Sequence, residues 1–145
     1  MSESARLFAG IGSRDRGDDG VGPWVAEALA LRGRRAVAFG GDGAGLIALL
    51  EGERDVVLID ATRGAGPPGR HTVIDAGRQE VPRALFRCST HQFGVAEAVE
   101  TARALGILPP TLTLHGIEGR DFAPGARLSP EVARAARALV DALDR

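Results

Sequence analysis

The sequence predicts an α/β fold, a three-layer αβα sandwich around a twisted, mostly parallel sheet of about five strands. Short apolar runs alternate along the chain with stretches in which apolar residues recur at helical spacing, and this order favours a parallel sheet covered on both faces. The run Val56–Asp60 is β-branched and apolar on both faces, as expected of a central strand. A length of 145 residues suits one domain, so we expect residues 1–145 to form a single domain.

The first half of the chain contains three of the expected strands. Leu7–Ile11 is a short apolar run that ends in glycines, and the polar loop 12–20 follows it. From Val21 onwards apolar residues repeat at helical spacing, with Pro23 suited to a first helical turn. The remaining elements expected here are a strand at 36–39, a short helix at 44–50 and the central strand at 56–60.

The second half contains the other two strands and two long helices. His71–Ile74 is a weaker strand that suits an edge, and residues 81–90 look irregular. A helix with apolar positions from Val95 to Leu105 ends at Gly106. Residues 111–117 alternate like a strand, and Ser129 starts a final helix with one apolar face.

Composition and charge exclude several classes of protein. The formal net charge is −1, so no long-range field favours nucleic acid or an anionic membrane. No apolar run approaches the roughly 18 residues of a membrane span, and residues 1–6 do not resemble a signal peptide. The single cysteine, Cys88, cannot form an intramolecular disulfide, which fits a reducing compartment. We therefore expect a cytoplasmic protein.

Three polar clusters follow expected strands, where open α/β sheets place their sites. They are Arg16–Gly20 after the first strand, Asp60 at the end of the central strand, and Ser89–Gln92 just before a helix. Two carboxylates and the imidazole of His91 would suit a borderline metal such as Zn²⁺ or Ni²⁺.

Each cluster also has a structural interpretation. Asp18 or Asp19 could cap the following helix, and Asp60 could cap a turn. His91 could be a structural histidine, and Ser89 with Gln92 has the spacing of a capping box. We interpret the remaining histidines, His71 and His115, as structural residues within strands.

Familiar catalytic motifs are absent. The sequence contains neither the H-E-x-x-H of zinc peptidases nor the G-x-S-x-G of serine hydrolases, and Cys88 has no recognisable base partner. Gly10-Ile11-Gly12 begins like a dinucleotide fingerprint, but Asp15 stands where a third glycine should be. The acidic loop would also repel a pyrophosphate, so we reject a nucleotide site.

Four blocks, in order along nearly the whole chain, resemble the hydrogenase maturation proteases. The first two are Gly10–Gly12 with Arg16–Gly22, and the central strand Val57–Ala61 with its aspartate. The third is Ser89-Thr90-His91 followed by Phe93-Gly94. The fourth is Gly116-Ile117-Glu118 followed by Phe122, Gly125 and Leu128–Val132.

The resemblance implies a function and a set of residues. It suggests an aspartyl-type endopeptidase that removes the C-terminal tail of a [NiFe]-hydrogenase large-subunit precursor after nickel insertion. The family's metal-contacting and catalytic positions fall on Asp19, Asp60 and His91, with Asp18 as the register alternative to Asp19. Nickel would be supplied by the substrate, and another divalent metal could replace it in vitro. We expect a monomer whose partner is this precursor, with no nucleic-acid or membrane partner.

Two alternatives use the same residues. A nickel-site chaperone would bind the loaded precursor without cutting it, and a small-molecule hydrolase could share the scaffold. The chain also departs from the family pattern at two places: Ser13 replaces the usual asparagine, and Gly41–Ala44 replaces the usual Asp-Gly-Gly-Thr. Asp42 could take the role of the acid in that second loop.

Overall fold

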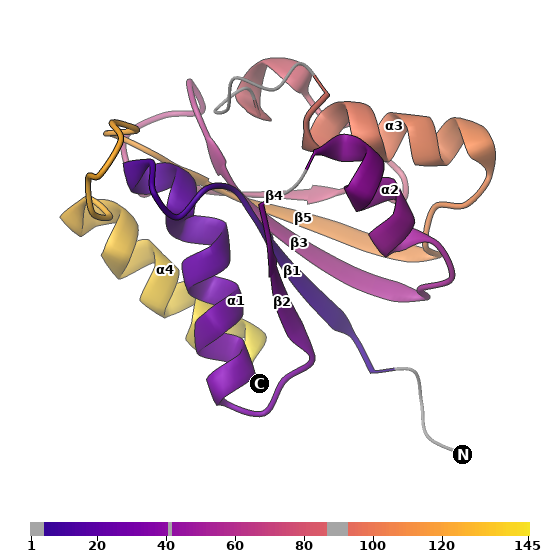
Figure 1. Cartoon of the computed structure of the whole chain (residues 1–145), viewed down its shortest axis with the longest axis horizontal. Helices are drawn as coiled ribbons and strands as arrows, with labels where there is room; N and C mark the ends of the chain where they lie inside the picture. The colour runs from indigo at the N-terminus through magenta and orange to yellow at the C-terminus, as the bar shows by residue number, and fades with distance from the viewer. Residues whose placement is uncertain (1–4, 41, 87–92) are drawn as a thin grey trace.

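A computed structural model describes residues 5–40, 42–86 and 93–145 of the chain. Helices cover both faces of a central sheet, so the predicted three-layer α/β architecture is confirmed (Figure 1). The strands are β1 (Leu7–Ile11), β2 (Ala36–Phe39), β3 (Asp55–Thr62), β4 (His71–Asp75) and β5 (Thr111–Glu118). The helices are α1 (Val21–Leu31), α2 (Gly43–Leu50), α3 (Val95–Leu105) and α4 (Pro130–Leu143), with short 3₁₀ turns η1 (Gly17–Gly20) and η2 (Arg83–Phe86).

The sheet has the strand order β2-β1-β3-β5-β4. All neighbours are parallel except β4, which pairs antiparallel with β5 at one edge, as the weak edge signal predicted. The chain leaves β1 toward β2 on one side and then returns to place β3 on the other side of β1. This reversal between β1 and β3 is a topological switch point, and open α/β sheets bind ligands at the carboxyl ends of such strands.

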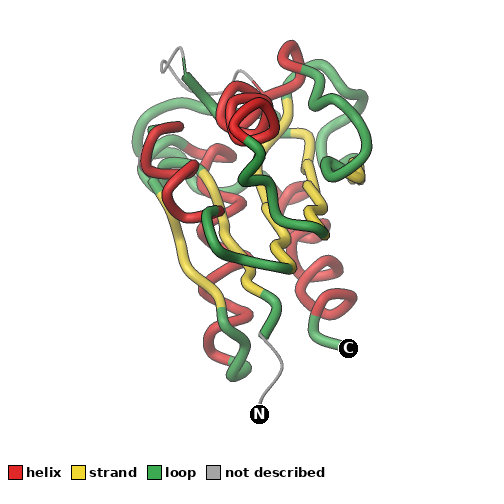
Figure 2. Tube along the Cα trace, turned by 90° about the vertical axis from the view of Figure 1, so that its right-hand side faces the viewer, coloured by secondary structure: helices red, strands yellow, loops and turns green. Residues whose placement is uncertain are grey.

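Two apolar cores lie on the two faces of the sheet. One joins the sheet to α2 and α3 through residues such as Leu46, Leu50 and Val99. The other joins it to α1 and α4 through residues such as Val25 and Leu139. In Figure 2 the strands lie between helices on both sides. The opposite placement of α1 and α2 follows from right-handed crossovers that travel in opposite directions along the sheet.

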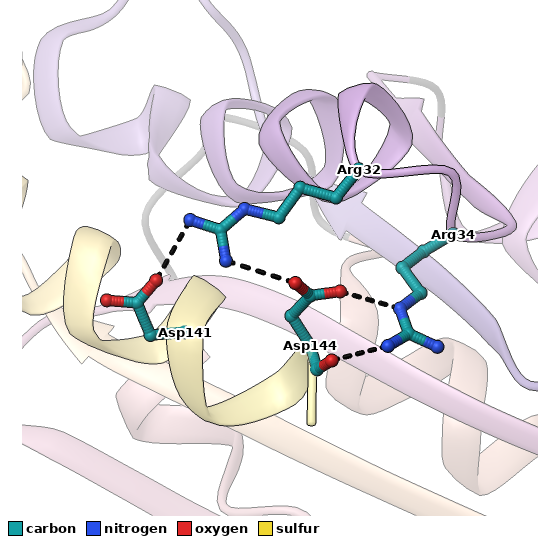
Figure 3. Close-up of polar contacts among 4 residues, drawn as sticks. All are labelled: Arg32, Arg34, Asp141 and Asp144. Carbon is teal, nitrogen blue, oxygen red and sulfur yellow. Dashed lines mark hydrogen bonds and ion pairs between the residues drawn. The ribbon is translucent and has the colours of Figure 1, made fainter.

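Charged side chains join the ends of α1 and α4 at the surface. Arg32 donates hydrogen bonds to Asp141 at 2.9 Å and to Asp144 at 3.1 Å (Figure 3). The Arg34 guanidinium also donates to Asp144, both to the side-chain carboxylate and to the backbone carbonyl of Asp144. The two guanidinium groups hold the pKa of the Asp144 carboxyl below its ordinary value. Because this network is exposed, it contributes little to stability and serves mainly to orient the helix ends.

Several boundaries differ from their predictions. β3 continues to Thr62, so Asp60 is not the last residue of the strand. Asp42 caps α2, where its side chain accepts a hydrogen bond from the backbone N–H of Gly45 at 3.2 Å. Such a capping role explains an acid in this loop without further chemistry.

In the part of the chain that the structure describes, no helix has the length and apolar character of a membrane span.

Candidate active site at the switch point between β1 and β3

Asp19 and Asp60 reach the switch point from neighbouring strands. Asp19 lies in η1, directly after the loop that leaves β1, and Asp60 lies near the carboxyl end of β3. Their exposed fractions are only 2% and 7%. Alternation along β3 places Asp60 on the same face as Leu58, the face covered by α2 and α3.

Glycines allow η1 and the first turn of α1 to lie directly against the end of β1. A Cβ atom on Gly10 would lie 1.9 Å from the carbonyl oxygen of Gly22, and one on Gly12 would lie 2.0 Å from that of Asp19. Gly12 also has a φ of 135°, which L-residues with side chains rarely adopt. The glycine pattern that begins like a dinucleotide fingerprint therefore serves close backbone packing. It brings the backbone N–H of Ser13 to 2.9 Å from Asp19 Oδ2.

The electrostatics of Asp60 distinguish it from an ordinary surface carboxylate. Burial raises the pKa of Asp60 well above its usual value, and the negative charge of Asp19 raises it further. A hydrogen bond of 2.8 Å from the backbone N–H of Ala61 opposes this shift in pKa. Two buried carboxylates that repel each other favour a proton or a cation between them. The pair can thus act as a proton-holding dyad or as oxygen ligands of a metal ion.

Asp18, in contrast, is occupied by structural hydrogen bonds. Its Oδ2 accepts from the backbone N–H groups of Arg120 and Asp121 and from the Ser129 hydroxyl, at 2.7, 2.9 and 2.7 Å. Its Oδ1 accepts from the backbone N–H of Ser129 at 2.7 Å. Asp18 is fully buried and ties η1 to the segment before α4. Because these bonds occupy Asp18, Asp19 is the acid of this loop whose charge raises the pKa of Asp60.

The structural alternative, in which Asp18 or Asp19 caps α1, is not what the structure shows. The N-cap of α1 is Gly20, which has no side-chain hydrogen bond. Asp18 instead fastens the start of α4, since it binds both the N–H and the hydroxyl of Ser129, the N-cap of that helix. Ser129 is at the predicted position, but its hydroxyl donates to Asp18 rather than capping its own helix.

Glu118 is a further buried carboxylate, which was not among the site residues expected from the sequence. It accepts hydrogen bonds from the Thr62 hydroxyl at 2.7 Å and from the backbone N–H groups of Gly64 and Ala65 at 2.8 and 2.9 Å. Glu118 therefore holds the loop that follows Asp60. The sequence feature that could have identified Glu118 is an acid at the end of an apolar strand, which is the same feature that identified Asp60.

The third predicted site residue, His91, lies outside the described residues, as do Ser89 and Gln92. The helix after them begins at Val95, and Glu97 Oε1 accepts from the backbone N–H of Gly94, the N-cap, at 3.0 Å. Glu97 therefore caps the start of α3 through the Gly94 N–H, and the capping interpretation of Ser89 and Gln92 lies outside the described residues. Within the described ranges, no three histidine, cysteine or acidic side chains group as a metal site.

A hollow lies beside the loop that leads from β1 to Asp19. Its volume is about 330 Å³, and it lies between the loop after β1 and the end of β2. This size is at the lower end of the range for small-ligand pockets. The lining residues are Gly12, Ser13, Arg14, Asp15, Pro23, Ala38 and Gly40. Ser13 connects the hollow to the site, because its N–H binds Asp19.

Comparison with known proteins identifies the family. The model of a family described as hydrogenase maturation protease (HycI) matches residues 27–144. The chain belongs to the hydrogenase maturation protease family. It is 31% identical over 137 residues to the hydrogenase expression/formation protein HupD of Rhodobacter capsulatus, a match that covers 88% of this chain. The chain spans 63% of the length of that relative.

Solved structures of hydrogenase maturation proteases share the fold. The hydrogenase 2 maturation peptidase of a Thaumarchaeota archaeon is 32% identical, with a TM-score of 0.65, and the match covers 96% of this chain and 95% of that one. The hydrogenase maturating endopeptidase HybD of E. coli is 21% identical, with a TM-score of 0.75 and coverage of 96% and 89%. At that identity the second likeness supports the fold alone.

Proposed function

We propose that this protein is an endopeptidase that removes the C-terminal tail of a [NiFe]-hydrogenase large-subunit precursor after nickel has been inserted. The observation that carries the proposal is the pair of buried carboxylates, Asp19 and Asp60, at the switch point of a chain in a family of peptidases. Asp18 and Glu118, the other buried acids in the described part of the chain, bind backbone donors instead.

Nickel enters this proposal as part of the substrate. The donor set fits a cation, because the repulsion between Asp19 and Asp60 that raises the pKa of Asp60 would be relieved by a positive charge. We propose that these two carboxylates, together with His91, contact nickel held by the precursor. Three protein ligands leave coordination positions for substrate groups, and a metal so bound can polarise a carbonyl or a water molecule.

The chain's own residues set the geometry for this contact. The N–H of Ser13 orients the Asp19 carboxylate, and the N–H of Ala61 orients that of Asp60. Glu118 and Asp18 hold the segments that surround the pair. We propose that the hollow beside Ser13 receives part of the precursor's tail, because Ser13 lines the hollow and its backbone N–H binds Asp19.

The test uses the large-subunit precursor in nickel-loaded and nickel-free forms, incubated separately with the purified protein. Intact mass spectrometry should show loss of a C-terminal fragment from the loaded form only. Efficient cleavage of the nickel-free precursor would refute the role of nickel. Binding of the loaded precursor with no loss of mass would instead support a non-cleaving nickel-site chaperone.

Variants assign the residues in the same assay. Asp19→Asn, Asp60→Asn and His91→Ala should each abolish cleavage, whereas His71→Ala, on an exposed edge strand, should cleave like the wild type. Near-normal cleavage by all three site variants would refute the assignment. We further propose that the protein acts in the cytoplasm and is a monomer. Sedimentation of the purified chain tests the oligomeric state, and its recovery in the cytoplasmic fraction of cells tests the location.

A further inference from the structure

His71 and His115 form a pair on the sheet face opposite to Asp60. His71 is on the edge strand β4 and His115 on β5, and both side chains lie on the face covered by α1 and α4. Nε2 of His71 lies 2.7 Å from Nδ1 of His115, and the ring centroids are 5.0 Å apart. His71 is exposed and His115 is half-buried, so solvent reaches the pair.

Both imidazoles are neutral at physiological pH. Burial lowers the pKa of His71, and burial, the neighbouring His71 and Arg6 together lower the pKa of His115 to about 4. A neutral imidazole presents one nitrogen lone pair, which is the form that binds metal ions. The charge of Arg6 is partly offset, because its guanidinium binds Asp55 at 3.1 Å.

The spacing of the two nitrogens is close to that of two ligands on one ion. Metal–nitrogen bonds of about 2.0–2.1 Å place two nitrogens about 3.3 Å apart at a tetrahedral angle and about 2.9 Å apart at a right angle. The observed 2.7 Å would need to open by only a few tenths of an ångström. The planes of the two rings differ by only 16°, so metal binding also requires the exposed ring of His71 to rotate until both lone pairs aim at one point.

We propose that His71 and His115 together bind one divalent transition-metal ion of the Cu²⁺, Ni²⁺ or Zn²⁺ class, with water in the remaining positions. This cross-strand site is separate from the proposed active site, because the sheet lies between them and they share no residue. The proposal does not depend on the peptidase function. Two neutral imidazoles favour these ions over Mg²⁺ and Ca²⁺, which prefer oxygen ligands.

The test is equilibrium dialysis of the untagged full-length protein against CuCl₂, NiCl₂ or ZnCl₂, with bound metal measured by mass spectrometry. A His91→Ala, Asp60→Asn double variant provides the background, since it removes two of the three ligands proposed for the active site and leaves Asp19 there without either partner. We expect this background to retain one ion per chain, with Cu²⁺ bound more tightly than Ni²⁺. Adding His71→Ala or His115→Ala should weaken binding at least tenfold.

Unfolding midpoints of all variants show whether each one is folded, and imidazole resonances give an independent readout. Zinc should shift the ring signals of His71 and His115 together in the double-variant background. Failure of the background to bind an ion, or retention of binding by a folded His71→Ala variant, would overturn the proposal. In either case the 2.7 Å contact would be a hydrogen bond between two rings and nothing more.

Discussion

Replacing Asp18 by asparagine tests the structural role of this buried carboxylate. Oδ2 of Asp18 accepts three hydrogen bonds and Oδ1 accepts one, all between 2.7 and 2.9 Å. The asparagine side chain has the same shape but one acceptor oxygen. If that oxygen takes the position of Oδ2, the amide group faces the backbone N–H of Ser129, and two donors then oppose each other.

The expected loss in the free energy of unfolding follows from these four hydrogen bonds. A buried donor left unpaired costs about 1–3 kcal/mol, and each of the three remaining bonds loses the strengthening of a charged acceptor, about 1 kcal/mol each. Removing a buried charge returns part of this, so we expect Asp18→Asn to lower the free energy of unfolding by about 2–4 kcal/mol. Asp18→Ala, which leaves every donor unpaired, should cost more than Asp18→Asn.

The assay is urea denaturation followed by the fluorescence of Trp24, the single tryptophan. With a slope of about 2 kcal/mol per molar urea, the midpoint of Asp18→Asn should fall by about 1–2 M. Asp141→Asn is the matched control, because Asp141 is an exposed acid whose ion pair with Arg32 lies at the surface (Figure 3). Its midpoint should stay close to that of the wild type. An unchanged midpoint for Asp18→Asn would refute the structural role of Asp18.

Three further predictions concern stability. Because the pKa of Asp60 is raised in the folded state, the wild type loses stability as the pH rises through that pKa. Asp60→Asn should therefore be more stable than the wild type by about 0.5–2 kcal/mol at pH 8, with a smaller gain at pH 5. An equal gain at both pH values would contradict the raised pKa. Glu118→Ala should lower the free energy of unfolding by about 1–3 kcal/mol and speed hydrogen exchange at the backbone amides of Gly64 and Ala65. Unchanged exchange at these amides would show that Glu118 does not hold the loop. Gly10→Ala should cost about 3 kcal/mol in urea unfolding, because its Cβ would overlap the Gly22 carbonyl, and a wild-type midpoint would contradict that packing.

Periodicity was sufficient to predict the architecture. Each apolar run that was expected as a strand is one, including the edge strand that begins at His71. The ends of elements were harder to predict, because they depend on tertiary hydrogen bonds. β3 continues two residues beyond Asp60, since pairing with β5 extends through Thr62 and Glu118.

The sequence could not predict which of the buried acids are structural and which belong to the candidate site. Asp18 and Asp19 are adjacent and chemically identical, and both are buried. Only the fold shows that the donors of residues 120–129, more than 100 positions away, meet Asp18 and not Asp19. In the same way Glu118 lies next to the loop after β3 only because β5 pairs with β3. Local patterns do not report contacts at such separations.

We propose that the acidic pair of Asp19 and Asp60 cuts the nickel-loaded precursor. The most direct test measures the intact mass of that precursor after incubation with the wild type and with Asp60→Asn, at equal concentrations of folded protein. We expect a shortened precursor with the wild type and a full-length precursor with Asp60→Asn, although this variant should be at least as stable as the wild type. Cleavage by Asp60→Asn at the wild-type rate would contradict it.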